Sequence, residues 1–331
     1  MDRVVLVTDH TWPSLEPEAA VLQRVGARLV VAETGEEGEL LALVPEADAI
    51  LTCFARVSEE VVRAGGRLQV IGRYGIGVDN IAVAEATKLG IPVTNVPAYC
   101  LDEVAEHTVG MLLALARGVH VYDRAIREGG WELSRAAPLH RVAGRTLAIV
   151  GFGKIGQAVA RRAAGLGLRV LAVDRTTTRA AIDPSGAEPA SLDEALPQAD
   201  FVSLHCPLTN ETRELIDESR LRRMKPTAFL INTARGGLVD HDALLRALRE
   251  GWIAGAGLDV FDPEPLPDGH PLLREPNLVA TPHVAFYSEE SLVELETLAA
   301  ENVAAVLEGR MPASVVNPAV LDLQRWEHLR S

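Results

Sequence analysis

Three side chains of complementary chemistry follow three separate apolar runs in the second half of the chain. Arg235 lies in INTARGGLVD, Glu264 in GLDVFDPEP and His283 in TPHVAFYS. Histidine is the side chain whose ordinary pKa suits proton transfer near neutral pH. A neighbouring carboxylate favours the charged imidazole and orients the ring, and a guanidinium can hold a carboxylate and polarise a carbonyl group. Together these residue types predict reduction of a 2-oxo acid, in which the histidine donates a proton, the carboxylate orients the imidazole and the arginine binds the substrate.

Each of the three residues also has a non-catalytic interpretation. His283 could be a core histidine or a loop cap, Glu264 could be a solvated turn residue between two prolines, and Arg235 could pair with a surface acid. What favours catalysis is their shared position after predicted strands, where open α/β sheets place their chemistry.

A glycine-rich string, GFGKIG, lies between a predicted strand at 147–150 and a predicted helix at 157–166. This is the context that a dinucleotide-binding motif requires. Gly151 permits the tight turn, Gly153 lets the backbone approach a pyrophosphate, and Gly156 lets the helix pack on the strand. The helix N-terminus then offers N–H groups and partial positive charge to the phosphates.

The next predicted strand, at 169–173, ends in Asp174. A carboxylate at this point can accept hydrogen bonds from ribose hydroxyls and would repel a 2′-phosphate, so NAD is favoured over NADP. Arg175 follows directly and weakens that preference.

Short aliphatic runs alternate with helical patterns along the whole chain, which indicates βαβ units and parallel sheets. Two series of strands predict two doubly wound domains. Residues 1–100 together with 288–331 are expected to form a substrate domain, and residues 101–287 a nucleotide-binding domain. Helices are predicted at 102–117 and 288–308. The predicted strands are 4–7, 28–31, 49–52, 68–71, 92–94, 147–150, 169–173, 201–204, 228–231, 255–258 and 278–280.

Composition narrows the possible partners and cell compartment. The net charge of −14 disfavours nucleic acid as a partner. Three cysteines without a CxxC pair predict neither a disulfide framework nor a zinc site, and no metal is expected. The opening MDRVVLVTDH lacks the features of a signal peptide, and no apolar run is long enough to span a membrane. We therefore expect a cytoplasmic protein.

Seven segments of the chain resemble the D-isomer-specific 2-hydroxyacid dehydrogenase family. They are RYGIGVDNI, NVPAYCLDEVAEHTVGMLLAL, GFGKIGQAVA, SLHCPLTNET, FLINTARGGLVD, GAGLDVFDPEP and TPHVAFYS, and they cover the chain from about residue 70 onward. The resemblance implies a Rossmann NAD-binding domain inserted into a flavodoxin-like substrate domain, a homodimer, and NAD-dependent oxidation and reduction of small 2-hydroxy and 2-oxo acids.

The resemblance also implies roles for individual residues. Arg235, Glu264 and His283 take the catalytic roles described above. Arg73, Ile76, Gly77 and Phe286 would contact the substrate, the middle two through backbone N–H groups. Together with the glycine motif, it assigns cofactor contacts to Val104, Gly151, Gly153, Lys154, Ile155, Gly156, Asp174, Arg175, Cys206, Thr212, Thr233, Ala234 and Asp259.

Within the family, the strings HVAFYSEES and NTARGGLVD are most similar to the C-terminal binding proteins, although Phe286 stands where that group has Trp. Similarity to 3-phosphoglycerate dehydrogenase is also present, but Thr52 stands where that group carries a basic residue. The formate dehydrogenases of the family have Gln in the place of Glu264. Because Glu stands here, a hydroxy acid is favoured over formate as the substrate. Two further hypotheses stay open: an NAD-sensing interaction protein, and a hydrolase that uses bound NAD transiently.

Four other residues could carry chemistry but have simpler interpretations. Glu106 and His107 are adjacent, yet no third metal ligand has suitable spacing. Cys206 is expected to line the cofactor site rather than act as a nucleophile, because no activating base is evident. Trp131 is expected to be a packing residue.

Overall fold

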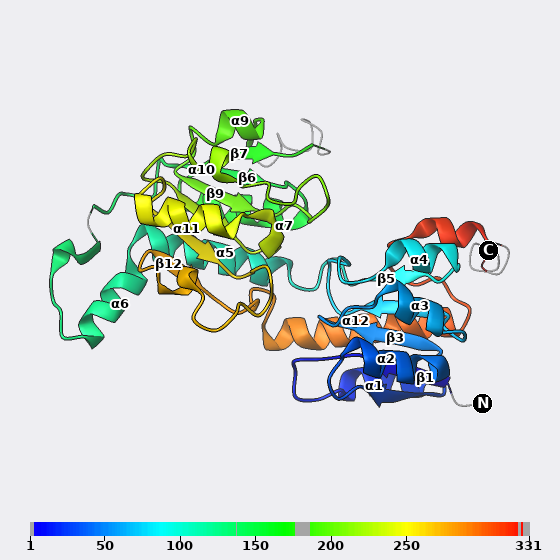
Figure 1. Ribbon diagram of the computed structural model, residues 1–331. Helices are drawn as coiled ribbons and strands as arrows, with labels where there is room; N and C mark the ends of the chain where they lie inside the picture. The colour runs from blue at the N-terminus through cyan, green and yellow to red at the C-terminus, as the bar shows by residue number, and fades with distance from the viewer. Residues whose placement is uncertain (1–2, 137, 176–185, 324–325, 327–331) are drawn as a thin grey trace. The chain divides into compact units, whose positions relative to one another are not determined.

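The computed structural model describes residues 3–136, 138–175, 186–323 and 326. It consists of two compact units (Figure 1), one comprising Met1–Tyr99 with Ser288–Ser331 and the other Cys100–Tyr287. None of the helices in the described ranges has the length and apolar character needed to cross a membrane.

The first unit is built on a five-stranded sheet in the order β2-β1-β3-β4-β5. Every pairing in it is parallel. All residues of the central strands β3 and β4 are buried, as expected when helices cover both faces of a parallel sheet, whereas the edge strand β2 is partly exposed. The strands are β1 (Arg3–Val7), β2 (Ala27–Val31), β3 (Ala49–Thr52), β4 (Val70–Arg73) and β5 (Val93–Thr94).

Helix α12 (Glu289–Leu307) returns to this sheet from the far end of the chain. It begins at a capping box in which the Ser288 hydroxyl accepts a hydrogen bond from Ser291 N. A Cβ on Gly72 of β4 would lie 2.7 Å from Val303 Cγ2, so only glycine allows this helix to pack so closely on the strand. The other helices of the unit are α1 (Glu16–Gln23), α2 (Glu37–Leu43), α3 (Glu59–Ala64) and α4 (Val83–Lys88), with 3₁₀ turns η1 (Val44–Glu46) and η6 (Pro318–Asp322).

The second unit contains a seven-stranded sheet in the order β12-β11-β10-β9-β6-β7-β8. All its pairings are parallel. Because the strands run the same way, the segments that follow their carboxyl ends gather along one edge of the sheet. The strands are β6 (Thr146–Val150), β7 (Arg169–Val173), β8 (Glu188–Pro189), β9 (Phe201–Leu204), β10 (Phe229–Asn232), β11 (Gly255–Leu258) and β12 (Leu278–Ala280).

Helix α5 (Leu101–Ala116) packs against α7 and strand β10. Its exposed Asp102 and Glu106 both pair with Arg162 of α7, at 2.8 and 3.0 Å. The remaining helices are α6 (Val119–Arg127), α7 (Lys154–Gly165), α9 (Leu192–Ala195), α10 (Glu218–Leu221) and α11 (His241–Glu250), with 3₁₀ turns η2 (Leu133–Ala136), η4 (Gly236–Leu238) and η5 (Pro271–Arg274).

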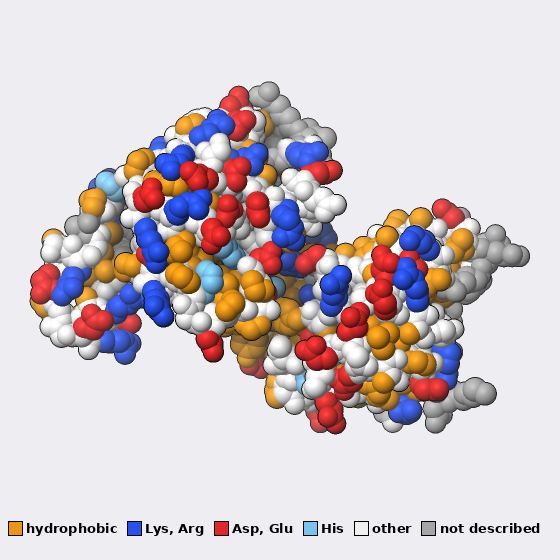
Figure 2. All heavy atoms as spheres, in the orientation of Figure 1, with side chains coloured by type: hydrophobic (Ala, Val, Ile, Leu, Met, Phe, Trp, Pro, Cys, Tyr) orange, Lys and Arg blue, Asp and Glu red, His pale blue; other side chains and the backbone are white. Residues whose placement is uncertain are grey.

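The predicted fold class is confirmed. The first sheet has the flavodoxin-like order, and six strands of the second have the order of a Rossmann sheet, extended by β12. Acidic and basic side chains are interspersed over the face in view (Figure 2).

Some predicted boundaries were wrong. The strand expected at 68–71 is Val70–Arg73, because Leu68 still belongs to a turn that bonds to Gly65 O. The strand expected at 228–231 begins and ends one residue later. Helix α7 begins at Lys154, directly after Gly153, and not at residue 157. Strand β8 was not predicted, because two polar or proline residues carry no strand pattern.

Candidate active site

In the glycine turn between β6 and α7, two of the three positions have no room for a side chain, and the third faces open space. Gly151 has a φ of 95°, and a Cβ there would lie 2.4 Å from Cys206 N. A Cβ on Gly156 would lie 2.3 Å from Gly151 O, so the helix packs directly on the turn. A Cβ on Gly153 would meet nothing within 4 Å. The turn thus leaves open space at the residue before α7, as a bound pyrophosphate requires.

Asp174 follows β7 and lies beside this turn. Its Oδ2 accepts a hydrogen bond of 2.6 Å from Phe152 N. The neighbouring Arg175 is directed to Glu211, 3.4 Å away, with four-fifths of its side chain exposed. The basic residue that weakened the preference for NAD is therefore paired with an acid.

The segments after β9 and β10 continue the same edge of the sheet. The side chains of Ser203 and His205 share a 2.8 Å hydrogen bond. Burial lowers the pKa of His205 to about 4 and raises the pKa of Cys206 to about 11, so both side chains are uncharged at neutral pH. An uncharged thiol is a poor nucleophile, which agrees with the interpretation of Cys206 as a lining residue.

Thr233 and Ala234 follow β10. The Thr233 hydroxyl lies 2.9 Å from that of Thr108 in α5, and Ala234 N donates to Asn232 Oδ1. Of the other residues assigned to the cofactor, Val104 is buried in α5, Lys154 and Ile155 form the first turn of α7, and the Thr212 hydroxyl donates to Pro207 O in its own loop.

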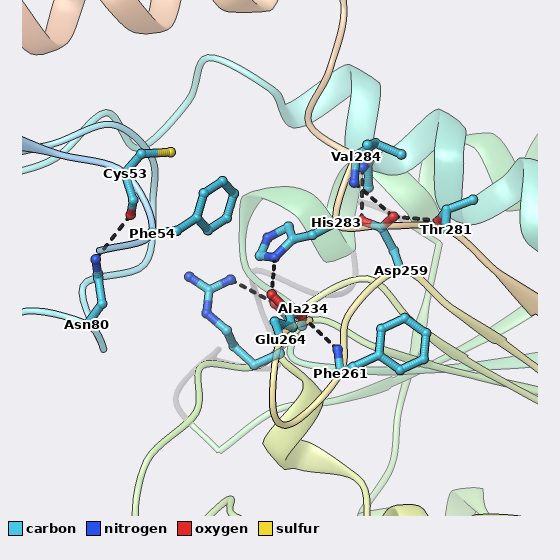
Figure 3. Close-up of polar contacts among 12 residues, drawn as sticks. Cys53, Phe54, Asn80, Ala234, Asp259, Phe261, Glu264, Thr281, His283 and Val284 are labelled. Carbon is cyan, nitrogen blue, oxygen red and sulfur yellow. Dashed lines mark hydrogen bonds and ion pairs between the residues drawn. The ribbon is translucent and has the colours of Figure 1, made fainter. Parts of the chain in front are cut away.

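Two of the three predicted catalytic residues contact each other directly. Nδ1 of His283 lies 2.7 Å from Oε2 of Glu264 (Figure 3). Oε1 of Glu264 accepts a second 2.7 Å hydrogen bond from Phe261 N, which fixes the carboxylate in its turn. Both side chains are partly exposed. The arrangement can therefore orient the imidazole and stabilise its charged form while its other nitrogen performs proton transfer.

Arg235 follows β10 in a turn that touches the Glu264 turn. Its Nη1 donates to Ala234 O at 2.8 Å. A Cβ on Gly236 would lie 1.9 Å from the carbonyl carbon of Phe261, so the turns bearing Arg235 and Glu264 are in backbone contact. Asn232 Nδ2 donates to Arg235 O. Sequence reasoning missed Asn232, which is fully buried; the visible signal was an amide residue directly after the apolar run FLI.

The predicted substrate loop belongs to the first unit and follows β4. Arg73 is buried and donates to the carbonyl of Tyr74. The Asn95 amide donates to Ile76 O at 2.7 Å, which holds the segment that leads to Gly77. In the same unit, the Cys53 and Phe54 amides both donate to the Asp9 carboxylate.

Phe286 and Trp131 have different surroundings. The ring centroid of Phe286 lies 6.3 Å from that of His283 in an edge-on arrangement, so this side chain borders the His283 imidazole. The prediction of Trp131 as a packing residue was wrong, because 87% of it is exposed. It follows the exposed turn after α6.

Comparison with protein-family models now identifies the second unit. The model of the D-isomer specific 2-hydroxyacid dehydrogenase, NAD binding domain, matches residues 109–285. The chain belongs to the D-isomer-specific 2-hydroxyacid dehydrogenase family. It is an NAD-dependent oxidoreductase that acts on 2-hydroxy acids, and NAD is its cofactor.

Individual relatives of this dehydrogenase agree with the assignment. It is 44% identical over 289 residues to a glyoxylate reductase of Korarchaeum cryptofilum (strain OPF8), covering 86% of this chain and 87% of the relative. It is 43% identical over 294 residues to a glyoxylate reductase of Pyrococcus furiosus (strain ATCC 43587 / DSM 3638 / JCM 8422 / Vc1), covering 87% of each.

Solved structures extend the comparison to the fold. The TT0316 protein from Thermus thermophilus has a TM-score of 0.86 and 40% identity, covering 95% of this chain and 99% of that one. D-lactate dehydrogenase from Aquifex aeolicus, complexed with NAD and lactic acid, has a TM-score of 0.85 and 28% identity over the same shares. The finer placement beside the C-terminal binding proteins and 3-phosphoglycerate dehydrogenase stays a prediction.

Proposed function

We propose that this dehydrogenase reduces a small 2-oxo acid, with glyoxylate as the first candidate, and that His283 is the proton donor. The observation that carries the proposal is the 2.7 Å contact between the His283 imidazole and the Glu264 carboxylate at the edge of the Rossmann sheet. Glyoxylate is the substrate named for the relatives from Korarchaeum and Pyrococcus, which match most of the chain.

Reduction requires a hydride at the substrate C2 and a proton at its carbonyl oxygen. NADH, when bound, supplies the hydride. His283 holds the proton on Nε2, while its Nδ1–H donates to Glu264 and keeps the ring oriented. The Glu264 carboxylate accepts the hydrogen bond from Nδ1–H both before and after the transfer. In the oxidative direction the same nitrogen accepts the hydroxyl proton.

Arg235 binds the substrate carboxylate and polarises the carbonyl group. Its main chain is held by Asn232, and one guanidinium nitrogen is held by the Ala234 carbonyl. The family resemblance assigns further substrate contacts to the backbone N–H groups of Ile76 and Gly77 and to Arg73, which is buried in the first unit. Phe286, which borders His283, limits the size of the substrate side chain.

Residues of the glycine turn and the neighbouring strand ends would hold NAD. Gly151, Gly153 and Gly156 supply a turn with room for the pyrophosphate. The Asp174 carboxylate accepts hydrogen bonds from the ribose, which favours NAD over NADP. The resemblance assigns the other contacts to Val104, Lys154, Ile155, Cys206, Thr212, Thr233, Ala234 and Asp259, of which Asp259 is fully buried.

The test follows NADH absorbance on addition of glyoxylate, hydroxypyruvate and longer 2-oxo acids. We expect His283→Ala to lower turnover far more than it raises KM, since it removes a proton donor. Arg235→Ala should abolish reduction and still bind NADH. His140→Gln, an exposed histidine in the same unit, is the control. An unchanged turnover number in His283→Ala would remove this residue as proton donor, and no oxidation of NADH with any 2-oxo acid would overturn the proposal.

We also propose that the chain forms a homodimer through α6 and the turn after it. Val119 and Ile126 are each 56% exposed, and Trp131 and Leu133 are each 87% exposed. Large apolar side chains gathered on one segment of a surface mark an interaction site. A second copy of the chain is the partner that the family resemblance implies.

A further inference from the structure

The turn that carries His283 is held by one buried residue that directly follows β11. Asp259 is fully buried, and its backbone carbonyl accepts a 2.7 Å hydrogen bond from His283 N. Its carboxylate accepts hydrogen bonds from Val284 N at 3.0 Å and Ala285 N at 2.9 Å, and a third from the Thr281 hydroxyl (Figure 3). Three successive amides of the turn are therefore bound to a single residue.

The clamp holds His283 in an unusual backbone conformation. Its φ of 55° lies in the left-handed region, which residues other than glycine seldom adopt. Such a conformation persists only where the surroundings over-determine it. The direction of the imidazole follows from this backbone conformation. Loss of the hydrogen bonds to Asp259 would therefore let the His283 ring change its orientation.

His107 of α5 extends the clamp through a hydrogen bond to Thr281. Its Nε2 lies 2.9 Å from Thr281 Oγ1 and 3.7 Å from Asp259 Oδ1. The Thr281 hydroxyl has one proton, which it donates to Asp259. The proton between His107 and Thr281 must therefore lie on Nε2, which makes His107 the donor. A chain of donors thus runs from α5 through Thr281 to the Asp259 carboxylate.

We propose that His107 and Thr281 are positioning residues, which hold the Asp259 clamp so that the His283 imidazole keeps its direction for proton transfer. The proposal rests on the proposed role of His283. It gives a role to His107 and Thr281, which lie in two of the segments that resemble the family but had been assigned no part in binding or catalysis. Neither residue is placed in contact with the reacting atoms.

Thr281→Val tests the proposal, because valine has nearly the shape of threonine but no hydroxyl. We expect kcat to fall about tenfold, the loss typical of one hydrogen bond to a charged group, with KM changed by less than about twofold. Amide exchange in the peptide covering residues 281–287, measured by mass spectrometry, should accelerate.

Two variants and one control separate positioning from general damage. Thr281→Ser restores a hydroxyl and should recover most of kcat, and His107→Leu should repeat the effects of Thr281→Val. Thr227→Val makes the same change at an exposed threonine of the same unit and should alter neither turnover nor exchange.

The outcomes distinguish this proposal from the proposed function. If His283→Ala abolishes turnover while Thr281→Val keeps both normal kcat and slow exchange, the positioning role is wrong and the proton donor stands. If His283→Ala turns over normally, the proposed function fails, and with it the positioning role. A fall in kcat that Thr281→Ser does not recover would also overturn the assignment to the hydroxyl.

Discussion

Two glutamates buried together in the first unit make its stability depend on pH. Glu18 of α1 is fully buried and accepts a 3.3 Å hydrogen bond from the Trp12 indole, and Glu296 of α12 is 4% exposed. Tyr74 packs edge-on against Trp12, with ring centroids 4.9 Å apart. Burial raises the pKa of Glu18, and burial together with the neighbouring Glu18 raises the pKa of Glu296 to about 8. We predict that Glu296→Gln stabilises the unit at neutral and alkaline pH.

The size of the effect follows from the proton that Glu296 takes up on folding. In the unfolded chain its pKa is about 4.5, so below that value both states are protonated and the contribution to stability is complete. Between about 4.5 and about 8 only the folded state keeps the proton. The free energy of unfolding then falls by about 1.4 kcal/mol per pH unit. The fall ends above the folded pKa.

Glutamine at position 296 has no proton to lose, so the stabilisation of the variant over the wild type should grow across this window. At pH 7 it should reach about 3 kcal/mol as an upper limit. The amide would also offer a hydrogen-bond donor to the Glu18 carboxylate, which assists its ionisation.

Hydrogen exchange of α12 peptides is the suitable assay, because it reports on this region without requiring the whole chain to unfold in one step. Variant and wild type are compared at each pH between 5 and 8, so that intrinsic exchange rates cancel. Glu294→Gln, an exposed position of the same helix, is the matched control and should give a difference that does not change with pH. A pH-independent difference for Glu296→Gln would refute the reasoning.

Three further predictions concern cofactor, catalysis and assembly. Gly151→Ala should weaken NADH binding at least about tenfold in a fluorescence titration, because its Cβ would lie 2.4 Å from a backbone nitrogen. Gly165→Ala, where a Cβ meets nothing within 4 Å, should bind NADH normally, and equal affinity of the two variants would contradict the role of the turn. Glu264→Gln should lower turnover roughly 100-fold, because an amide stabilises the His283 imidazolium less than a carboxylate does; full activity would exclude the pairing from the mechanism. Trp131→Glu should sediment as a single chain, whereas an unchanged dimer would place the interface elsewhere.

Local features of the sequence were enough to predict the class of the fold and the chemistry of the site. Alternating aliphatic runs and helical patterns depend on neighbouring residues only, so parallel α/β units could be recognised. The string GFGKIG was informative because it lies between a predicted strand and a predicted helix, the local context that a dinucleotide-binding turn requires. His283 and Glu264 could be proposed as a pair because their residue types complement each other, and the structure shows them hydrogen-bonded.

Tertiary structure decided the features that depend on contacts between distant segments. The strand orders follow from pairings that no local pattern encodes, and Trp131 was misjudged because an aromatic residue looks the same in sequence whether it is buried or exposed. The Asp259 clamp brings together residues from the turns after β11 and β12 and from α5, and the Glu18–Glu296 pair joins helices from opposite ends of the chain. Burial and hydrogen bonding are properties of the packed chain, so these pKa shifts and backbone constraints arise only when the chain has folded.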